Sequence, residues 1–161
     1  MQTFIIDDGT REINLTNQFN EPIATIRVRT SDISIYDRYQ DLMSDFPNIV
    51  SPLANINIDA DGSTENGDDW KILKDVEANL IARLNALFDT KDIGRIFKKR
   101  NAFSAIGGHF FVENVMNTLG QIITEAIEEE ARLTQARTGE YLKDITPGVD
   151  SNETGDTANK S

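Results

Sequence analysis

The chain has 161 residues and a formal net charge of -11, with 16 Lys and Arg against 27 Asp and Glu, one His and no Cys. The missing Cys excludes disulfides, thiol nucleophiles and thiolate zinc sites, and no segment approaches the ~18 consecutive apolar residues of a membrane span. The acidic balance argues against a general binder of nucleic acids or anionic membranes, because neutralising phosphate groups requires clustered Lys and Arg.

The N-terminal region has the alternating, β-branched pattern of short strands. Residues 4–6 form one apolar run and residues 13–15 continue it at period two, with Asp-Asp-Gly-Thr at 7–10 between them. Asp-Gly between apolar runs predicts a tight hairpin turn, since Gly tolerates the positive φ that such a turn requires. A second turn at 20–22 and an alternating run at 23–28 predict a third strand.

Two amphipathic helices are predicted next. The first follows the N-capping residues 30–32 and ends at Pro47, and the second begins at Asp68 or Asp69. Apolar residues recur at helical spacing in both. They are Ile35, Tyr36, Tyr39, Leu42, Met43 and Phe46 in the first helix, and Trp70, Leu73, Val76, Leu80, Leu84 and Leu87 in the second.

The second half of the chain is predicted to hold a short piece around Ile93 to Phe97, a glycine turn and a long helix. Gly107-Gly108 predicts a sharp turn, and the helix runs from about His109 to Arg137. Its expected buried side consists of Val112, Val115, Met116, Leu119, Ile122, Ile123, Ala126 and Ile127.

These elements predict a single α+β domain, mainly α, over residues 1–145. A short N-terminal antiparallel β-meander (3–29) precedes a helical part (31–143) of three or four helices, which an acidic loop (57–69) interrupts. Residues 146–161 are predicted to be a disordered tail, because so polar a segment buries too little to offset about 1–2 kcal/mol of backbone entropy per residue.

The acidic loop contains a partial calcium-loop pattern. Asn57, Asp59, Asp61, Gly62 and Asp68 occupy its first, third, fifth, sixth and twelfth places. The first ligand is Asn where Asp is usual, and the twelfth is Asp where the longer Glu provides two oxygens. The sequence therefore favours a solvated acidic linker, and we expect no resident metal.

No pattern of catalytic residues emerges. His109 is the one imidazole, and its neighbours Gly107, Gly108, Phe110 and Phe111 provide neither a nucleophile nor a carboxylate. The Lys-Ser/Thr of a phosphate-binding loop does not follow the two glycines. We therefore expect no enzymatic activity and no cofactor.

A cluster of bases stands out against the acidic chain. Lys98, Lys99 and Arg100 follow Lys91 and Arg95, and aromatic residues flank them, as in a nucleic-acid patch. Because the surrounding chain is strongly acidic, the sequence favours a charge patch directed at another part of the chain or at a protein partner.

The order of these elements resembles the tail assembly chaperones of siphovirus-type phages of Gram-positive hosts, small proteins encoded just before the tape measure protein. The resemblance covers residues 3–143. It is based on the short β start and on three stretches, SDISIYDRYQDL, ALFDTKDIGRIF and NAFSAIGGHFFVENVMNTL, followed by a charged helix that ends near Tyr141.

The resemblance implies a non-enzymatic chaperone of the host cytoplasm, absent from the mature virion. Its expected partners are the tape measure protein, which it shields before the tube forms, the tail tube protein and further copies of itself. It also implies that a longer, frameshifted form could extend from Thr146. The alternative is a structural tail or head-tail connector protein, although a tube subunit needs more strand than this chain predicts.

A chaperone of this kind needs exposed apolar side chains. Phe103, Phe110 and Phe111 lie around the flexible glycine turn, and together with Phe97, which flanks the cluster of bases, they are the candidates for contacts with a partner. Packing within the core of the long helix is the alternative for the three residues around the turn.

Overall fold

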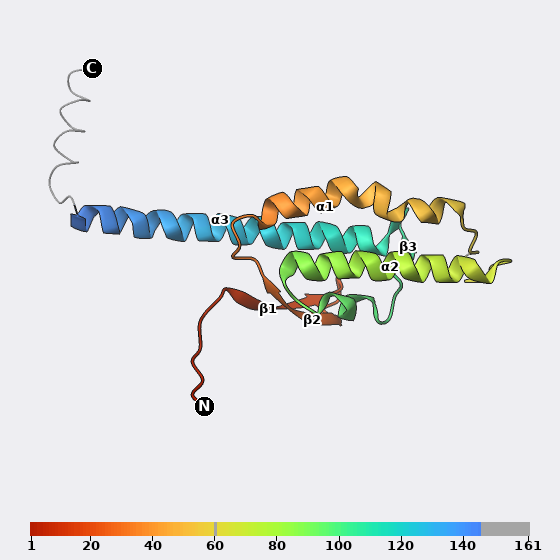
Figure 1. The fold of residues 1–161 in the computed structure, drawn as a ribbon, viewed down its shortest axis with the longest axis horizontal. Coiled ribbons are helices and arrows are strands. Elements are labelled where there is room, and N and C mark those ends of the chain that lie inside the picture. The colour runs from red at the N-terminus through yellow and green to blue at the C-terminus, as the bar shows by residue number, and fades with distance from the viewer. Residues whose placement is uncertain (60, 146–161) are drawn as a thin grey trace, which may run out of the picture. The chain divides into compact units, whose positions relative to one another are not determined.

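The computed structural model describes residues 1–59 and 61–145, without the side chains of residues 141 and 143–145. Within these residues an N-terminal antiparallel β-hairpin precedes three α-helices, and the predicted α+β, mainly helical class is confirmed (Figure 1). The elements are β1 (Thr10–Thr16), β2 (Pro22–Arg29), α1 (Ile35–Val50), the 3-10 helix η1 (Ser51–Asn55), α2 (Gly67–Phe88), the 3-10 helix η2 (Ile93–Phe97), β3 (Ala105–Ile106), β4 (His109–Phe110) and α3 (Phe111–Ile145).

The chain divides into two compact units, Met1–Thr124 and Glu125–Ser161. All elements before α3, together with the first part of α3, belong to the first unit. In the second unit the structure describes only the remainder of α3, and the predicted tail (146–161) lies outside the described residues. No helix in the described part of the chain is long and apolar enough to cross a membrane.

The N-terminal β structure is a two-stranded hairpin, so the predicted first strand at residues 4–6 is wrong. β1 pairs with β2 in the register Ile13↔Ile26, and the turn between them lies at residues 17–21. The Asp7 and Asp8 carboxylates each accept a backbone N–H two residues ahead, from Gly9 and Thr10.

These Asx bonds replace the hairpin turn predicted at 7–10. Asp8 makes two further contacts: its backbone carbonyl accepts the Ser31 hydroxyl, and its carboxylate pairs with Arg29. Residues 4–6 are thereby directed away from β1, and their side chains are 82 to 97% exposed.

Helix α1 continues through Pro47, where the sequence predicts that it ends. Proline at this position removes one hydrogen bond to the carbonyl four residues earlier, at Met43. Both Met43 and Pro47 are exposed, so water can satisfy that carbonyl. Burial of Ile49 in the last turn favours continuation of the helix to Val50.

Side chains bind α1 to the two longer helices. Arg38 donates to the Asp32 carboxylate (2.8 Å) and to the Leu87 carbonyl (3.2 Å), and Asp45 pairs with Arg83, so α1 and α2 run antiparallel. The Tyr39 hydroxyl donates to the Met116 carbonyl of α3 at 2.9 Å. Figure 1 shows α1 and α2 beside the first part of α3.

The core follows the predicted helical stripes of α2 and α3, whereas on α1 Tyr36 and Met43 of the predicted stripe are exposed. Leu80 and Leu84 are fully buried in α2, whereas Trp70 and Leu73 at its N-terminal end are half-buried. Phe88 and Ile93 close the core where α2 ends. On α3 the buried side chains are Val112, Val115, Met116, Leu119, Ile123 and Ala126, as predicted, while Ile122 and Ile127 are half-buried.

Helix α2 begins at Gly67, with Asn66 as its N-cap, one residue before the predicted start. The Asn66 side chain accepts the Asp68 N–H at 3.0 Å. We expect Asn66→Ala to lower the free energy of unfolding by about 1 kcal/mol, because this N–H loses its acceptor. Asn66→Asp keeps an acceptor and should remain close to wild type in urea unfolding. Equal losses in both variants would contradict a capping role.

Candidate partner-binding surface

The polypeptide between η2 and α3 folds into a small hairpin of β3 and β4. Gly107 and Gly108 occupy its two central positions with φ of 59° and 85°, which confirms the predicted turn. Two positive φ values in succession are typical of a type I′ turn and favour glycine. The Phe110 N–H donates to the Glu113 carboxylate at 2.7 Å and joins the hairpin to the first turn of α3.

The structure brings the four candidate phenylalanines together in two edge-to-face pairs. Phe97 and Phe111 have ring centroids 5.7 Å apart, and Phe103 and Phe110 have theirs 5.4 Å apart. Phe97 and Phe103 are both buried at 8% exposure, whereas Phe111 is half-buried and Phe110 is 37% exposed. Each pair therefore joins one core ring to one ring nearer the surface.

Phe110 lines the first of two grooves that flank this hairpin. This loop groove of about 600 Å³ lies between the acidic loop, the start of α2 and the hairpin. The Trp70 indole N–H donates to the Gly62 carbonyl at 2.8 Å and fixes the loop at its rim. The groove is mainly apolar, with Leu53, Ile56, Ile58, Trp70, Leu73, Phe103, Ala105 and Phe110 among its lining residues.

Phe111 lines the second groove. This basic groove of about 700 Å³ lies between the β1–β2 turn and the segment after η2. Its apolar residues are Phe19, Pro22, Ile23, Ile96, Ile106 and Phe111, and its bases are Arg95, Lys98, Lys99 and Arg100. The Arg100 guanidinium lies over the Phe111 ring, 5.7 Å from its centroid, in a cation–π contact.

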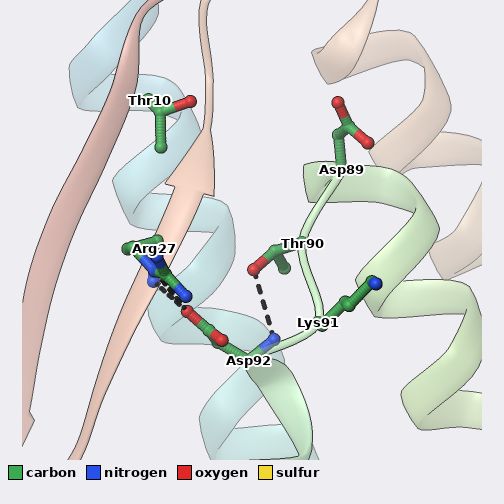
Figure 2. A pocket seen from close by; sticks show the side chains of 6 residues that line it. All are labelled: Thr10, Arg27, Asp89, Thr90, Lys91 and Asp92. Carbon is green, nitrogen blue, oxygen red and sulfur yellow. Dashed lines mark hydrogen bonds and ion pairs between the residues drawn. The ribbon is translucent and has the colours of Figure 1, made fainter.

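A third, polar pocket of about 290 Å³ lies where η2 meets β2, and Figure 2 shows its lining. Asp92 accepts the Arg27 backbone N–H at 2.8 Å and its Nε–H at 3.3 Å. Arg95 also pairs with Asp92 at 3.3 Å and donates to the Thr25 carbonyl. These contacts of Asp92 and Arg95 join η2 to β2 at this pocket.

The Arg27 backbone N–H holds the pKa of the Asp92 carboxyl below its usual value, and the Arg27 and Arg95 side chains act in the same direction. The Thr10 hydroxyl and N–H likewise lower the pKa of Asp8 to about 2. The native state therefore binds fewer protons than the unfolded state near pH 4. The stabilisation is present above the ordinary pKa and is lost as the pH falls through the folded-state values.

We expect Asp92→Asn to lower the free energy of unfolding at pH 7 and to matter less at an acidic pH below the lowered pKa of Asp92, where the wild-type carboxyl is itself protonated. Urea unfolding at the two pH values measures the difference. Asp75→Asn, on the exposed face of α2, makes the same charge change and should have little effect at either pH. An Asp92→Asn loss of the same size at both pH values would contradict an ionic role for this contact.

The calcium-loop candidates form hydrogen bonds within the acidic loop. The Ser63 hydroxyl donates to Asp59 and Asp61, at 3.1 and 2.7 Å. Asn57 lies on the approach to α2, where its N–H donates to Asp69, and Asp68 lies in the first turn of the helix. Across residues 1–59 and 61–145, no three carboxylate or imidazole side chains gather as a metal-binding group.

His109 lies on β4 with its side chain 67% exposed. Its Nδ1 is 4.0 Å from a Glu113 carboxylate oxygen, at the first turn of α3. His109 is thus an exposed residue of β4, just before α3 begins.

Sequence reasoning did not identify the contribution of the β1–β2 turn to the basic groove. Phe19 is 72% exposed and Ile23 is 39% exposed, and both lie opposite bases that are distant in sequence. A large apolar residue in a turn was the available signal, because turns are usually polar.

No protein-family model, curated protein or solved structure matches this chain.

Proposed function

We propose that the protein is a phage tail assembly chaperone that binds and solubilises the tape measure protein during tail morphogenesis, without enzymatic activity. Two lines of argument support this: the resemblance in element order over residues 3–143, and the exposed aromatic ring of Phe110 beside a large apolar groove. The second carries the proposal, because a protein that masks apolar helices needs an accessible apolar surface of its own.

The proposed binding mode places apolar side chains of the client in the loop groove and against Phe110. The buried Phe103 ring contacts the Phe110 ring edge to face, so the Phe110 ring is held in position before the client binds. A surface that is already ordered loses less conformational entropy on binding. The β3–β4 hairpin therefore acts as a preformed contact point.

The charge of the chain suits this task. With a net charge of -11, complexes that cover an apolar client repel one another and stay dispersed. Burial in the loop groove needs no chemical step, so the client can be released when tube subunits compete for the same apolar faces. The chaperone would then be absent from the mature particle.

Two experiments test this function. The proposal predicts a long helical reading frame immediately downstream of the gene, and the tagged chain, expressed with its product, should co-purify with that product. Mass spectrometry of mature particles should then fail to detect the chain. Stoichiometric amounts in mature particles would contradict the chaperone and favour a structural tail or connector protein. Failure to co-purify would contradict the tape measure protein as client.

A further inference from the structure

We propose that the basic groove is a second docking site, which takes an acidic amphipathic helical segment of a protein partner. This site lies apart from Phe110 and the loop groove, and it stands whether or not the client is a tape measure protein. The proposal depends on two features of the same surface, an apolar floor and three cations, Lys98, Lys99 and Arg100, that pair with no carboxylate in the part of the chain that the structure describes.

The floor forms a continuous trough along the start of α3. The basic groove and an adjoining groove of about 200 Å³ share Ile23, Ile96, Phe111 and Asn114. Along α3 the trough extends from Phe111 to Leu119, which at 1.5 Å per residue is about 12 Å, or two turns of a bound helix. An amphipathic helix of that length presents three or so apolar anchors to such a floor.

The rim provides the charge. Lys98, Lys99 and Arg100 are exposed, and within the described residues no ion pair joins any of them to a carboxylate. In a chain with 27 acidic residues, three adjacent unpaired cations beside an apolar trough are complementary to an apolar helix face with acidic flanks. The charge complementarity identifies the partner segment as acidic.

A nucleic acid fits this surface less well than a protein helix. Single strands bind by stacking bases on exposed aromatic faces. Here Arg100 covers the Phe111 ring and Phe97 contacts it as well, so Phe19 is the one groove aromatic that is mostly exposed. Aliphatic Ile23 and Ile96 complete the floor and offer no stacking surface.

The test uses a labelled helical peptide of about 18 residues, with leucines at i, i+3, i+4 and i+7 and glutamates on the flanks, titrated with the full chain by fluorescence anisotropy. We expect saturable binding that weakens with salt. Lys98→Glu/Lys99→Glu should weaken it about tenfold, since each exposed pair lost also becomes a repulsion. Lys71→Glu/Lys74→Glu makes the same charge change on exposed α2 positions and should change affinity less than about twofold.

A second variant tests the apolar floor without changing charge. Phe19→Ser should weaken peptide binding, whereas Ile33→Ser, at a side chain that is 98% exposed and does not line the groove, should not. Circular dichroism of each variant establishes that it is folded.

Four results would overturn the proposal. The first is that the two double Lys→Glu variants weaken peptide binding equally, and the second is that a peptide with lysines in place of its glutamates binds equally well. The third is that a single-stranded oligonucleotide binds more tightly than the peptide and that Lys98→Glu/Lys99→Glu abolishes this binding. The fourth is that the wild type binds no peptide but forms an oligomer, which Lys98→Glu/Lys99→Glu disrupts. The last would assign the groove to a second copy of the chain. Phe110 does not line the basic groove. Client binding at Phe110 can therefore be disproved while peptide binding at the basic groove is confirmed, and peptide binding can be disproved while client binding is confirmed.

Discussion

Replacing Gly120 by alanine is expected to lower the free energy of unfolding by about 2 kcal/mol, although alanine is the better helix former. Gly120 lies on α3 where Tyr39 of α1 approaches most closely. An added Cβ would lie 2.5 Å from the Tyr39 hydroxyl oxygen and 2.8 Å from its Cζ. The ring cannot retreat easily, because it is buried at 8% exposure and its hydroxyl binds the Met116 carbonyl. Burial also raises the pKa of the Tyr39 hydroxyl.

A double-mutant cycle separates this contact from general helix effects. Tyr39→Phe removes the oxygen and loses one buried hydrogen bond, at about 1 kcal/mol. In that background Gly120→Ala should cost less than in the wild type, because the closest atom is gone. Gly139→Ala, at a position on α3 where a new Cβ meets nothing within 4 Å, should not lower stability. Strictly additive effects of Tyr39→Phe and Gly120→Ala would contradict close packing of α1 on α3.

Replacing Phe110 by serine is expected to weaken client binding by about thirtyfold or more, as for an aromatic residue at the centre of an interface. The fold should survive, because Phe110 is 37% exposed and its main described ring contact is with Phe103. Titration of a soluble client segment against each variant measures the affinity.

Tyr36→Ser provides the matched control for Phe110→Ser. Tyr36 is an aromatic residue of α1 with 47% exposure, and it lines neither groove. Its substitution should leave client affinity within about twofold of wild type. If the Phe110→Ser chain unfolds before it loses the client, Phe110 is a core residue. If the Tyr36→Ser chain loses as much client affinity as Phe110→Ser, the apolar contact is unspecific.

Periodicity predicted the helices well because each helix buries one stripe. The spacing of Leu80, Leu84 and Leu87 on α2 and of Val112 and Leu119 on α3 identifies side chains that the structure buries. Turn chemistry was equally informative at Gly107-Gly108, where backbone conformation depends on the residue itself.

Two predictions, the strand at residues 4–6 and the helix end at Pro47, were wrong because local sequence preferences compete there with hydrogen bonds or burial elsewhere in the structure. Phe4–Ile6 have the composition of a strand, yet Asp7 and Asp8 bind nearby backbone groups and Asp8 is further bound to Ser31 and Arg29. Pro47 predicts a helix end, but burial of Ile49 outweighs the one lost hydrogen bond. Neither competition can be judged from the residues alone.

The candidate surface was predictable in part. The four candidate phenylalanines do come together, but which rings are buried depends on the packing of η2 and α3, so Phe97 and Phe103 could not be separated from Phe110 in advance. The basic groove needs Phe19 and Lys98 on one surface. Tertiary structure alone brings such distant residues together.

The most direct test of the proposed chaperone is the soluble fraction of the tape measure candidate, expressed at a fixed level with increasing amounts of the full chain. We expect the client to be insoluble alone, to become soluble in proportion to the wild-type chain, and to remain insoluble with an equal amount of folded Phe110→Ser chain. The chaperone proposal would be contradicted by a client whose solubility does not depend on the chain, or depends equally on wild type and Phe110→Ser.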